Sequence, residues 1–316
     1  MTMTYFRVPL QMSSVLRLAV VTLVTLGSST VLGQGTDFVY RGDPRFGGAR
    51  GAALGGSVVS DNHDIETLYW NPAGMKTLAY PGLALDHRHD WDNGVFDESL
   101  AMRLFDTGAH AVGLGVRLTH TGGTNPIHPM NFRQYSVDLA YAYEILTEFN
   151  AGILAGVRQG SANGETRTGY SITLGLMYTP DRSISYALCI RDLGRSIEYT
   201  LHRSNNTTVA GYDEFHPATT ELSSTLRFPA RNRAPFLSLM VAIENNHILK
   251  EFRYKGGLEL LLFGNTVAAR VGMVNASARE ASGGLGLALG RFRIDYAIMP
   301  RISSARYDEI SLKAIF

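Results

Sequence analysis

Apolar and polar residues alternate along most of the chain after residue 80, in short segments separated by turn residues. A period of two is the pattern of β-strands whose two faces meet different surroundings. The clearest segment places on one face Tyr170, Ile172, Leu174, Leu176 and Tyr178, opposite Ser171, Thr173, Gly175 and Met177. Aromatic residues close both ends of this aliphatic band, as they do on the lipid-facing side of a transmembrane barrel.

Segments of this kind begin near residues 81, 97, 109, 134, 150, 168, 183, 220, 235, 252, 266, 284, 291 and 307. They predict about fourteen strands, and an even number fits a closed bacterial barrel. A soluble β-sandwich also alternates, so a single strand decides little, whereas the number of strands decides more. We therefore predict an all-β fold, a transmembrane antiparallel outer-membrane β-barrel over residues 81–316.

The connections between these segments differ in length. Short ones such as 106–108, 146–150, 179–182 and 263–265 alternate with longer ones such as 119–133, 159–169 and 192–219. Outer-membrane barrels have short periplasmic turns and longer outer loops. We therefore expect both termini in the periplasm.

The two ends of the sequence agree with an exported barrel. Arg7 and Arg17 precede an apolar run over 18–26, which is far shorter than the ~20 residues of a spanning helix, and small residues follow as far as Gly33. This pattern predicts a cleavable export signal peptide over residues 1–33. At the other end, the outward face of the last strand finishes with Phe316, similar to the assembly signal that barrel-assembly machinery recognises in its clients.

Residues 34–80 do not alternate, and we expect them to form a small N-terminal hatch, or plug, inside or beneath the barrel. Glycines that include Gly51, Gly55 and Gly56 permit close backbone approach. Asp61 and Asp64 belong to an acidic patch that follows them. Trp70 anchors a turn made by Asn71, Pro72 and Gly74, since the Asn side chain bonds its own backbone, Pro fixes φ and Gly tolerates positive φ. A nucleotide-binding role for the glycines is poorly supported, because no strand precedes them and no Lys-Ser/Thr pair follows.

This segment also carries a family resemblance. The run GARGAALGG, the acidic patch and the run YWNPAGM together resemble the N-terminal signature of the PorV/PorQ family of outer-membrane proteins, which is similar to the FadL fatty-acid transporters. The ending EISLKAIF also looks like that family's final strand. The resemblance implies a fourteen-stranded barrel with a hatch that binds type IX secretion components, or the C-terminal domains of secreted cargo, and passes cargo to surface attachment.

Composition narrows the chemistry. Charged residues make up 18% of the chain and the net charge is +1, which gives no reason to expect a nucleic-acid partner. Cys189 is the only cysteine, so a Cys-based zinc site within one chain is ruled out. His87 and His89 share one face of the first strand while Asp86, Arg88 and Asp90 occupy the other, so only the two histidines could share a metal ion. No Gly-x-Ser-x-Gly elbow occurs. We expect no enzyme activity, no cofactor and no metal, and we expect charges in the lumen to pair with one another.

The longest connection, 192–219, is a candidate partner-binding outer loop through Tyr199, His202, Arg203, Tyr212 and Phe215. Three functions remain open. The first is a PorV/PorQ-type role in type IX secretion, the second is FadL-like transport of hydrophobic small molecules, and the third is a structural envelope barrel. Transport of hydrophobic molecules needs a continuous apolar path, whereas the predicted inward faces are mostly small and charged. That contrast favours the first.

Overall fold

The computed structural model describes residues 47–61, 64–91, 94–121, 132–162, 165–195, 197–199, 212–214, 218–228, 236–247, 250–275, 279–300 and 306–316. The predicted signal peptide lies outside these residues, as does the first part of the predicted hatch. Within the described part of the chain, no helix is long and apolar enough to cross a membrane.

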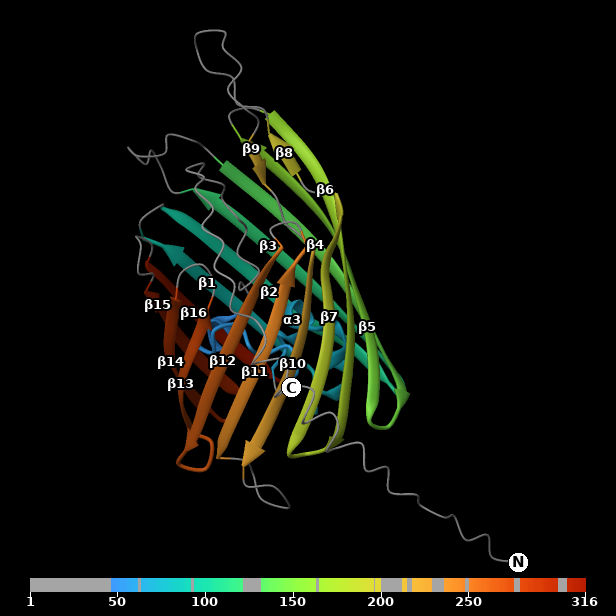
Figure 1. Ribbon diagram of the computed structural model, residues 1–316, viewed down its shortest axis with the longest axis vertical. Coiled ribbons are helices and arrows are strands. Elements are labelled where there is room, and N and C mark those ends of the chain that lie inside the picture. The colour runs from blue at the N-terminus through green and yellow to red at the C-terminus, as the bar shows by residue number, and fades with distance from the viewer. Residues whose placement is uncertain are drawn as a thin grey trace, which may run out of the picture. The chain divides into compact units, whose positions relative to one another are not determined.

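Fourteen antiparallel strands form a closed barrel, in which β1 pairs with both β2 and β16 (Figure 1). Their bounds are β1 Gly82–Asp90, β2 Val95–Thr107, β3 His110–Thr121, β4 Phe132–Leu146, β5 Phe149–Ala162, β6 Glu165–Asp181, β7 Ile184–Arg195, β10 Thr219–Phe228, β11 Leu237–Asn246, β12 Glu251–Leu262, β13 Val267–Asn275, β14 Arg279–Leu289, β15 Phe292–Pro300 and β16 Arg306–Ile315. The predicted fold class is confirmed. Each strand neighbours the next one in sequence except β7, which pairs with β10 across a connection that contains the small hairpin of β8 (Ile197–Tyr199) and β9 (Tyr212–Glu214).

The predicted faces of the strands are confirmed as well. On β6 the outward side chains Tyr170, Leu174 and Tyr178 are exposed, whereas Thr173 and Met177 are buried. Membrane-facing residues of a barrel lie in lipid, so exposure of apolar side chains there is the expected arrangement.

One predicted loop is wrong. The sequence suggested a connection over 159–169, but β5 and β6 continue to Ala162 and from Glu165, with a register that runs from Arg158↔Gly169 to Ala162↔Glu165. Alternation of apolar and polar residues ends here although backbone pairing continues. Strands that leave the membrane have polar surroundings on both faces, and periodicity of hydrophobicity does not record them. The contrast between long and short connections is correspondingly weaker, and the periplasmic position of the termini stays a prediction.

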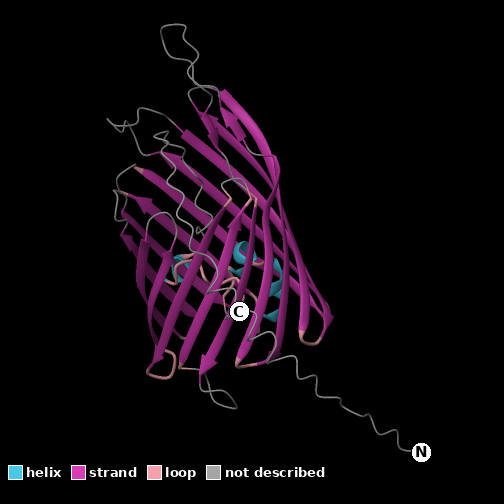
Figure 2. Ribbon diagram, viewed as in Figure 1, coloured by secondary structure: helices cyan, strands magenta, loops and turns pink. Residues whose placement is uncertain are grey.

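The described hatch, residues 47–61 and 64–80, holds the helices α2 (Ala49–Ala53), α3 (Thr67–Trp70) and the 3-10 helix η1 (Pro72–Thr77). Figure 2 shows these helices enclosed by the strands. Hatch side chains pack with inward-facing wall residues in three buried apolar clusters. One of them joins Leu54, Val59 and Trp70 of the hatch to Ala187, Cys189 and Met240 of the wall. The core of the protein therefore lies between the hatch and the barrel wall.

Candidate functional site

Glycine allows the hatch to fold into a very small space. Gly55 and Gly56 follow α2 with φ of 64° and 69°, values that side chains bearing a Cβ rarely adopt. Gly51 lies on α2 against the indole of Trp70, where an added Cβ would come within 2.6 Å of Cζ2. Trp70 Nε1 donates to the carbonyl of Gly47 at 2.7 Å. The indole thus joins the two halves of the hatch.

The WNPAG turn links the hatch to the wall. Asn71 Oδ1 accepts from the backbone N–H of Ala73 at 3.1 Å, which caps η1 at its N-terminus, and Pro72 is the first residue of that helix. Asn71 Nδ2 donates to the carbonyls of Val59 in the hatch and Leu176 in β6. Gly74 packs so closely on Thr67 that a Cβ there would overlap the threonine hydroxyl. These contacts explain Asn71 and Pro72 as predicted. The reason predicted for Gly74 is wrong: it lies within η1 and does not have a positive φ, and the residue is small because Thr67 leaves no room for a Cβ.

The wall carries glycines where the hatch touches it. A Cβ at Gly115 would meet the ring of Tyr69 at 2.7 Å, one at Gly113 would meet Leu68 at 2.6 Å, and one at Gly152 would overlap the backbone of Pro72 and Ala73. The same holds for Gly175, Gly257, Gly272 and Gly284. Small inward-facing residues of the wall therefore leave the space that the hatch occupies.

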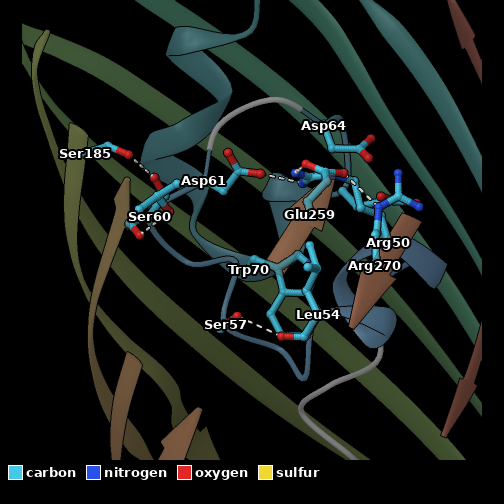
Figure 3. A network of polar contacts seen from close by, with 12 residues as sticks. Arg50, Leu54, Ser57, Ser60, Asp61, Asp64, Trp70, Ser185, Glu259 and Arg270 are labelled. Atoms are coloured by element: carbon cyan, nitrogen blue, oxygen red, sulfur yellow. Dashed lines mark hydrogen bonds and ion pairs between the residues drawn. The ribbon is translucent and has the colours of Figure 1, made fainter. Parts of the chain in front are cut away.

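Arg50 ties α2 to the wall (Figure 3). Its guanidinium donates from Nε and Nη2 to the two oxygens of Glu259 on β12, at 2.9 and 2.6 Å, and it also pairs with Asp61 of the hatch. Glu259 in turn accepts from Arg270 on β13 at 2.7 Å. All four side chains are buried. A bidentate, charge-assisted pair fixes position as well as charge, so Arg50 defines where α2 sits.

A second set of contacts holds the hatch from the side of β7 and β10. Asp61 accepts from Arg227 at 2.9 Å, and Ser60 forms hydroxyl hydrogen bonds with Ser223 and Thr225 at 2.7 and 2.8 Å. The hydroxyl of Ser185 donates to the Ser60 carbonyl. These contacts are polar and buried, and none is covalent. The acidic residue Asp61, selected from its motif, is therefore a contact to the wall.

Lys313 of β16 holds the hatch from the side of the barrel opposite β7 and β10. Its Nζ pairs with Asp64 and with Glu66 at 2.6 Å, both in the hatch, and with Asp295 of β15 at 3.0 Å. Burial alone would raise the pKa of Asp64, but the charges of Lys313 and Arg50 outweigh burial and hold that pKa below its usual value.

Glu66 behaves differently from its neighbour. Burial raises its pKa well above the usual value, and the charge of Asp64 adds to the rise. Glu66 also shares a hydrogen bond with Asp86 of β1. The two hatch carboxyl groups on Lys313 therefore have pKa values shifted in opposite directions.

Other lumen charges pair as expected. Arg117 pairs with Asp138 at 3.0 Å and Arg158 with Asp192 at 2.8 Å. Arg191 of β7 donates to Glu221 and to the carbonyl of Trp70, so one arginine contacts both wall and hatch. On β1, alternation correctly placed His87 and Arg88 on opposite faces; His87 is exposed and Arg88 is buried.

The structure does not bring all candidate residues together. Tyr199 and Tyr212 are paired in the β8–β9 hairpin, but their side chains, and His202, Arg203 and Phe215, lie outside the described residues. Phe316 ends beside β1, where its N–H donates to the carbonyl of Pro81, and its side chain is exposed. Its role in assembly stays a prediction.

Sequence reasoning missed the wall partners of the hatch. Lys313 lies 249 positions from Asp64, and Glu259 lies 209 positions from Arg50. Nothing in local periodicity relates such residues. Inward-facing charges on many strands, such as Glu259, Asp295 and Lys313, were the one available signal, since a buried charge requires a partner.

Within the described residues, no group of three or more histidine, cysteine or carboxylate side chains could hold a metal ion. The hatch site is instead a noncovalent closure, in which pairs of opposite charge and matched small residues keep a folded segment inside a barrel.

No protein-family model matches the chain, and no curated protein matches it. Solved structures do. The toluene transporter TbuX of Ralstonia pickettii shares 14% identity and a TM-score of 0.63, with 87% of this chain and 99% of that chain covered. The Pseudomonas putida toluene transporter TodX shares 13% identity and a TM-score of 0.61, with 85% and 96% covered, and a Pseudomonas aeruginosa FadL homologue shares 11% and 0.56, with 85% and 98% covered.

At these identities the likeness defines the fold. The chain has the fold of FadL-type, fourteen-stranded outer-membrane barrels. The matches leave the resemblance to the PorV/PorQ family unconfirmed.

Proposed function

We propose that the protein is a barrel of the outer membrane that passes small hydrophobic molecules through its lumen, with the hatch as the gate. The observation that carries the proposal is the hatch itself, packed inside a closed barrel whose structural neighbours are named as toluene transporters and a FadL homologue. A purely structural barrel has no need of a lumen closed by a separate segment. In this role the protein is surrounded by membrane lipid and acts without enzyme activity or a cofactor.

The contacts of the hatch suit a gate. They are ion pairs and hydrogen bonds, which can break and re-form, and the chain has one cysteine and therefore no internal disulfide to lock them. Charged pairs are costly to bury, and they hold one arrangement firmly only while every partner is in place. Loss of one pair should therefore destabilise the docked position of the whole hatch.

A crosslink across the hatch contact tests the proposal. Ser60 and Thr225 have hydroxyl oxygens 2.8 Å apart, so Ser60→Cys with Thr225→Cys places two thiols within disulfide reach, in a Cys189→Ser background. Cells that produce this variant would be assayed for uptake of radiolabelled toluene and of a radiolabelled long-chain fatty acid. We expect uptake to fall on oxidation and to return with reductant.

The single substitution Ser60→Cys, in the same background, is the matched control and should respond to neither treatment. Uptake that persists in the fully crosslinked barrel, at the level of this control, would show that the hatch is not a gate.

A second function follows from the lumen chemistry. The inward residues around the hatch are small and charged, and a hydrophobic ligand needs a continuous apolar path through them. This observation supports, as the second candidate, the PorV/PorQ-type role, in which the barrel binds type IX secretion components and cargo C-terminal domains. Affinity purification of the tagged barrel from native membranes separates the two: cargo with such domains supports secretion, whereas bound hydrophobic molecules without cargo support transport.

The membrane location is tested separately. An outer-membrane barrel should fractionate with the outer membrane and migrate differently on a detergent gel before and after heating. Recovery in the soluble fraction would contradict both proposed functions.

A further inference from the structure

The outer surface of the barrel carries a groove of about 470 Å³ across β16, β1, β2 and β3. Its apolar lining comes from outward-facing positions of these four strands: Leu85, Leu100, Val116, Leu118, Ile310 and Leu312. A volume of this size is within the range of small-ligand pockets. The groove lies on the face that a transmembrane barrel turns to lipid, on the other side of the wall from the hatch.

The strand registers arrange the lining in two rows. Leu312, Leu85, Leu100 and Val116 are cross-strand neighbours in the first row, which is wholly apolar. The second row runs through Ile310, His87, Glu98 and Leu118 in the same way. One end of the groove is therefore hydrocarbon-like, and the other end has a polar centre with apolar residues on both sides.

That polar centre is a hydrogen-bonded histidine–glutamate pair on the lipid-facing side. His87 Nδ1 and Glu98 Oε1 are 2.8 Å apart, and their side chains are 46% and 41% exposed. Charged groups on the lipid face of a barrel are destabilising, more so toward the middle of the membrane, and polar groups there usually have a function. Because about half of each side chain is exposed, the pair still needs polar or charged partners from outside the protein.

The row beyond the pair marks the membrane interface. It contains Asp308, His89, Phe96 and His120 as cross-strand neighbours, and the rings of His89 and Phe96 stack at 4.4 Å. A row that combines charged, imidazole and aromatic side chains is expected where a barrel strand leaves the hydrocarbon core. On that placement His87 and Glu98 lie one row inside the headgroup level, where the polar end of a lipid can reach them.

We propose that this groove binds one phospholipid with an ammonium-bearing headgroup. An acyl chain lies along the leucine, isoleucine and valine side chains, and the ammonium group donates to the Glu98 carboxylate. The phosphate accepts from Nε2 of His87 in its imidazolium form, whose Nδ1–H donates to Glu98. The occupant is inferred from charge complementarity. A carboxylate beside imidazoles matches a zwitterionic headgroup, and the apolar row matches a chain. The inference is independent of what the lumen transports.

The test counts lipids on the purified full-length barrel by native mass spectrometry, with phosphatidylethanolamine and phosphatidylglycerol as probes. Leu100→Trp fills the groove, and Leu174→Trp is its matched control, because Leu174 is an outward-facing leucine of β6, a strand that does not line the groove. We expect one phosphatidylethanolamine to stay bound to the native barrel and to Leu174→Trp, and to be lost from Leu100→Trp.

Glu98→Gln tests the headgroup contact. It should weaken phosphatidylethanolamine binding by about tenfold, as expected for a hydrogen bond to a charged group, and should leave phosphatidylglycerol binding unchanged. Heat-modifiable mobility verifies that each variant is folded. Equal lipid retention by the two tryptophan variants, no retained lipid at all, or a second copy of the chain on this face would overturn the proposal.

Discussion

Replacing Lys313 with methionine should loosen the hatch by an amount that can be worked out. The substitution removes the cation that pairs with Asp64, Glu66 and Asp295. Asp295 keeps Arg270 at 2.7 Å, and the raised pKa of Glu66 makes it the carboxyl group that loses its charge more readily. The loss therefore falls mainly on Asp64, which becomes a largely buried carboxylate, 11% exposed, without its nearest cation.

The cost has a ceiling, because a buried carboxylate can take up a proton instead of remaining charged. Protonating an aspartate whose ordinary pKa is about 3.9 costs about 4 kcal/mol at pH 7 and about 1.5 kcal/mol at pH 5. This is close to the range of ~3–5 kcal/mol observed when a buried pair loses one partner. The population of the open state of the hatch, relative to the docked state, should rise by up to roughly 1,000-fold at pH 7 and roughly tenfold at pH 5.

Cys189 provides the assay without any added label site. It is the only cysteine, it is buried, and its thiol contacts the carbonyl of Trp70 in the hatch. Its rate of reaction with a thiol reagent in the solubilised barrel therefore reports hatch opening. The ratio of variant to wild type at one pH cancels the change in thiol ionisation. Lys313→Met should label much faster than wild type, with the larger ratio at pH 7.

A matched control is Lys76→Met, also in the hatch. Lys76 pairs with Asp106 at 2.9 Å, and the Asp106 side chain is 26% exposed. Pairs open to water contribute about 0–1 kcal/mol, so labelling should rise less than about tenfold. The reasoning would be refuted if Lys313→Met labelled at the wild-type rate, or if its ratio did not decrease between pH 7 and pH 5.

Three further outcomes are expected. Gly152→Val should prevent docking of the hatch, because its side chain would overlap the backbone of η1, and should speed Cys189 labelling, whereas Gly283→Ala, with its nearest neighbour 3.6 Å from the new Cβ, should not. The pKa of Glu66 is raised when the hatch is docked, so protonation of Glu66 favours docking at low pH. This contribution is lost as pH rises through the raised pKa. Glu66→Gln is neutral at every pH and should therefore flatten the pH profile of Cys189 labelling. Deleting Phe316 should reduce the heat-modifiable barrel in the outer membrane, and full recovery of barrel would contradict its assembly role.

The fold was accessible from sequence because each membrane strand records its two surroundings in alternate residues. The segment from Tyr170 to Tyr178 is the clearest example. Each such strand can be predicted from the alternation of apolar and polar residues within it. Where both faces are wet, as at the outer ends of β5 and β6, that record ends and the loop over 159–169 was wrongly predicted. The strand count survived because each strand has a portion in the membrane.

The candidate site was only partly accessible. The sequence by itself determined the barrel, the small-residue hatch and the local roles of Asn71 and Pro72, because these depend on residues close together in the chain. The reason for Gly74 came only from the structure, where Thr67 leaves no room for a Cβ. The tertiary structure decided that Arg50 meets Glu259, that Lys313 serves two hatch carboxyls, and that Gly115 and Gly152 shape the wall around Tyr69 and η1. Closing the barrel brings β16 beside β1 and places both strands around the hatch. The pairing of strands so far apart in the chain cannot be predicted from patterns among neighbouring residues.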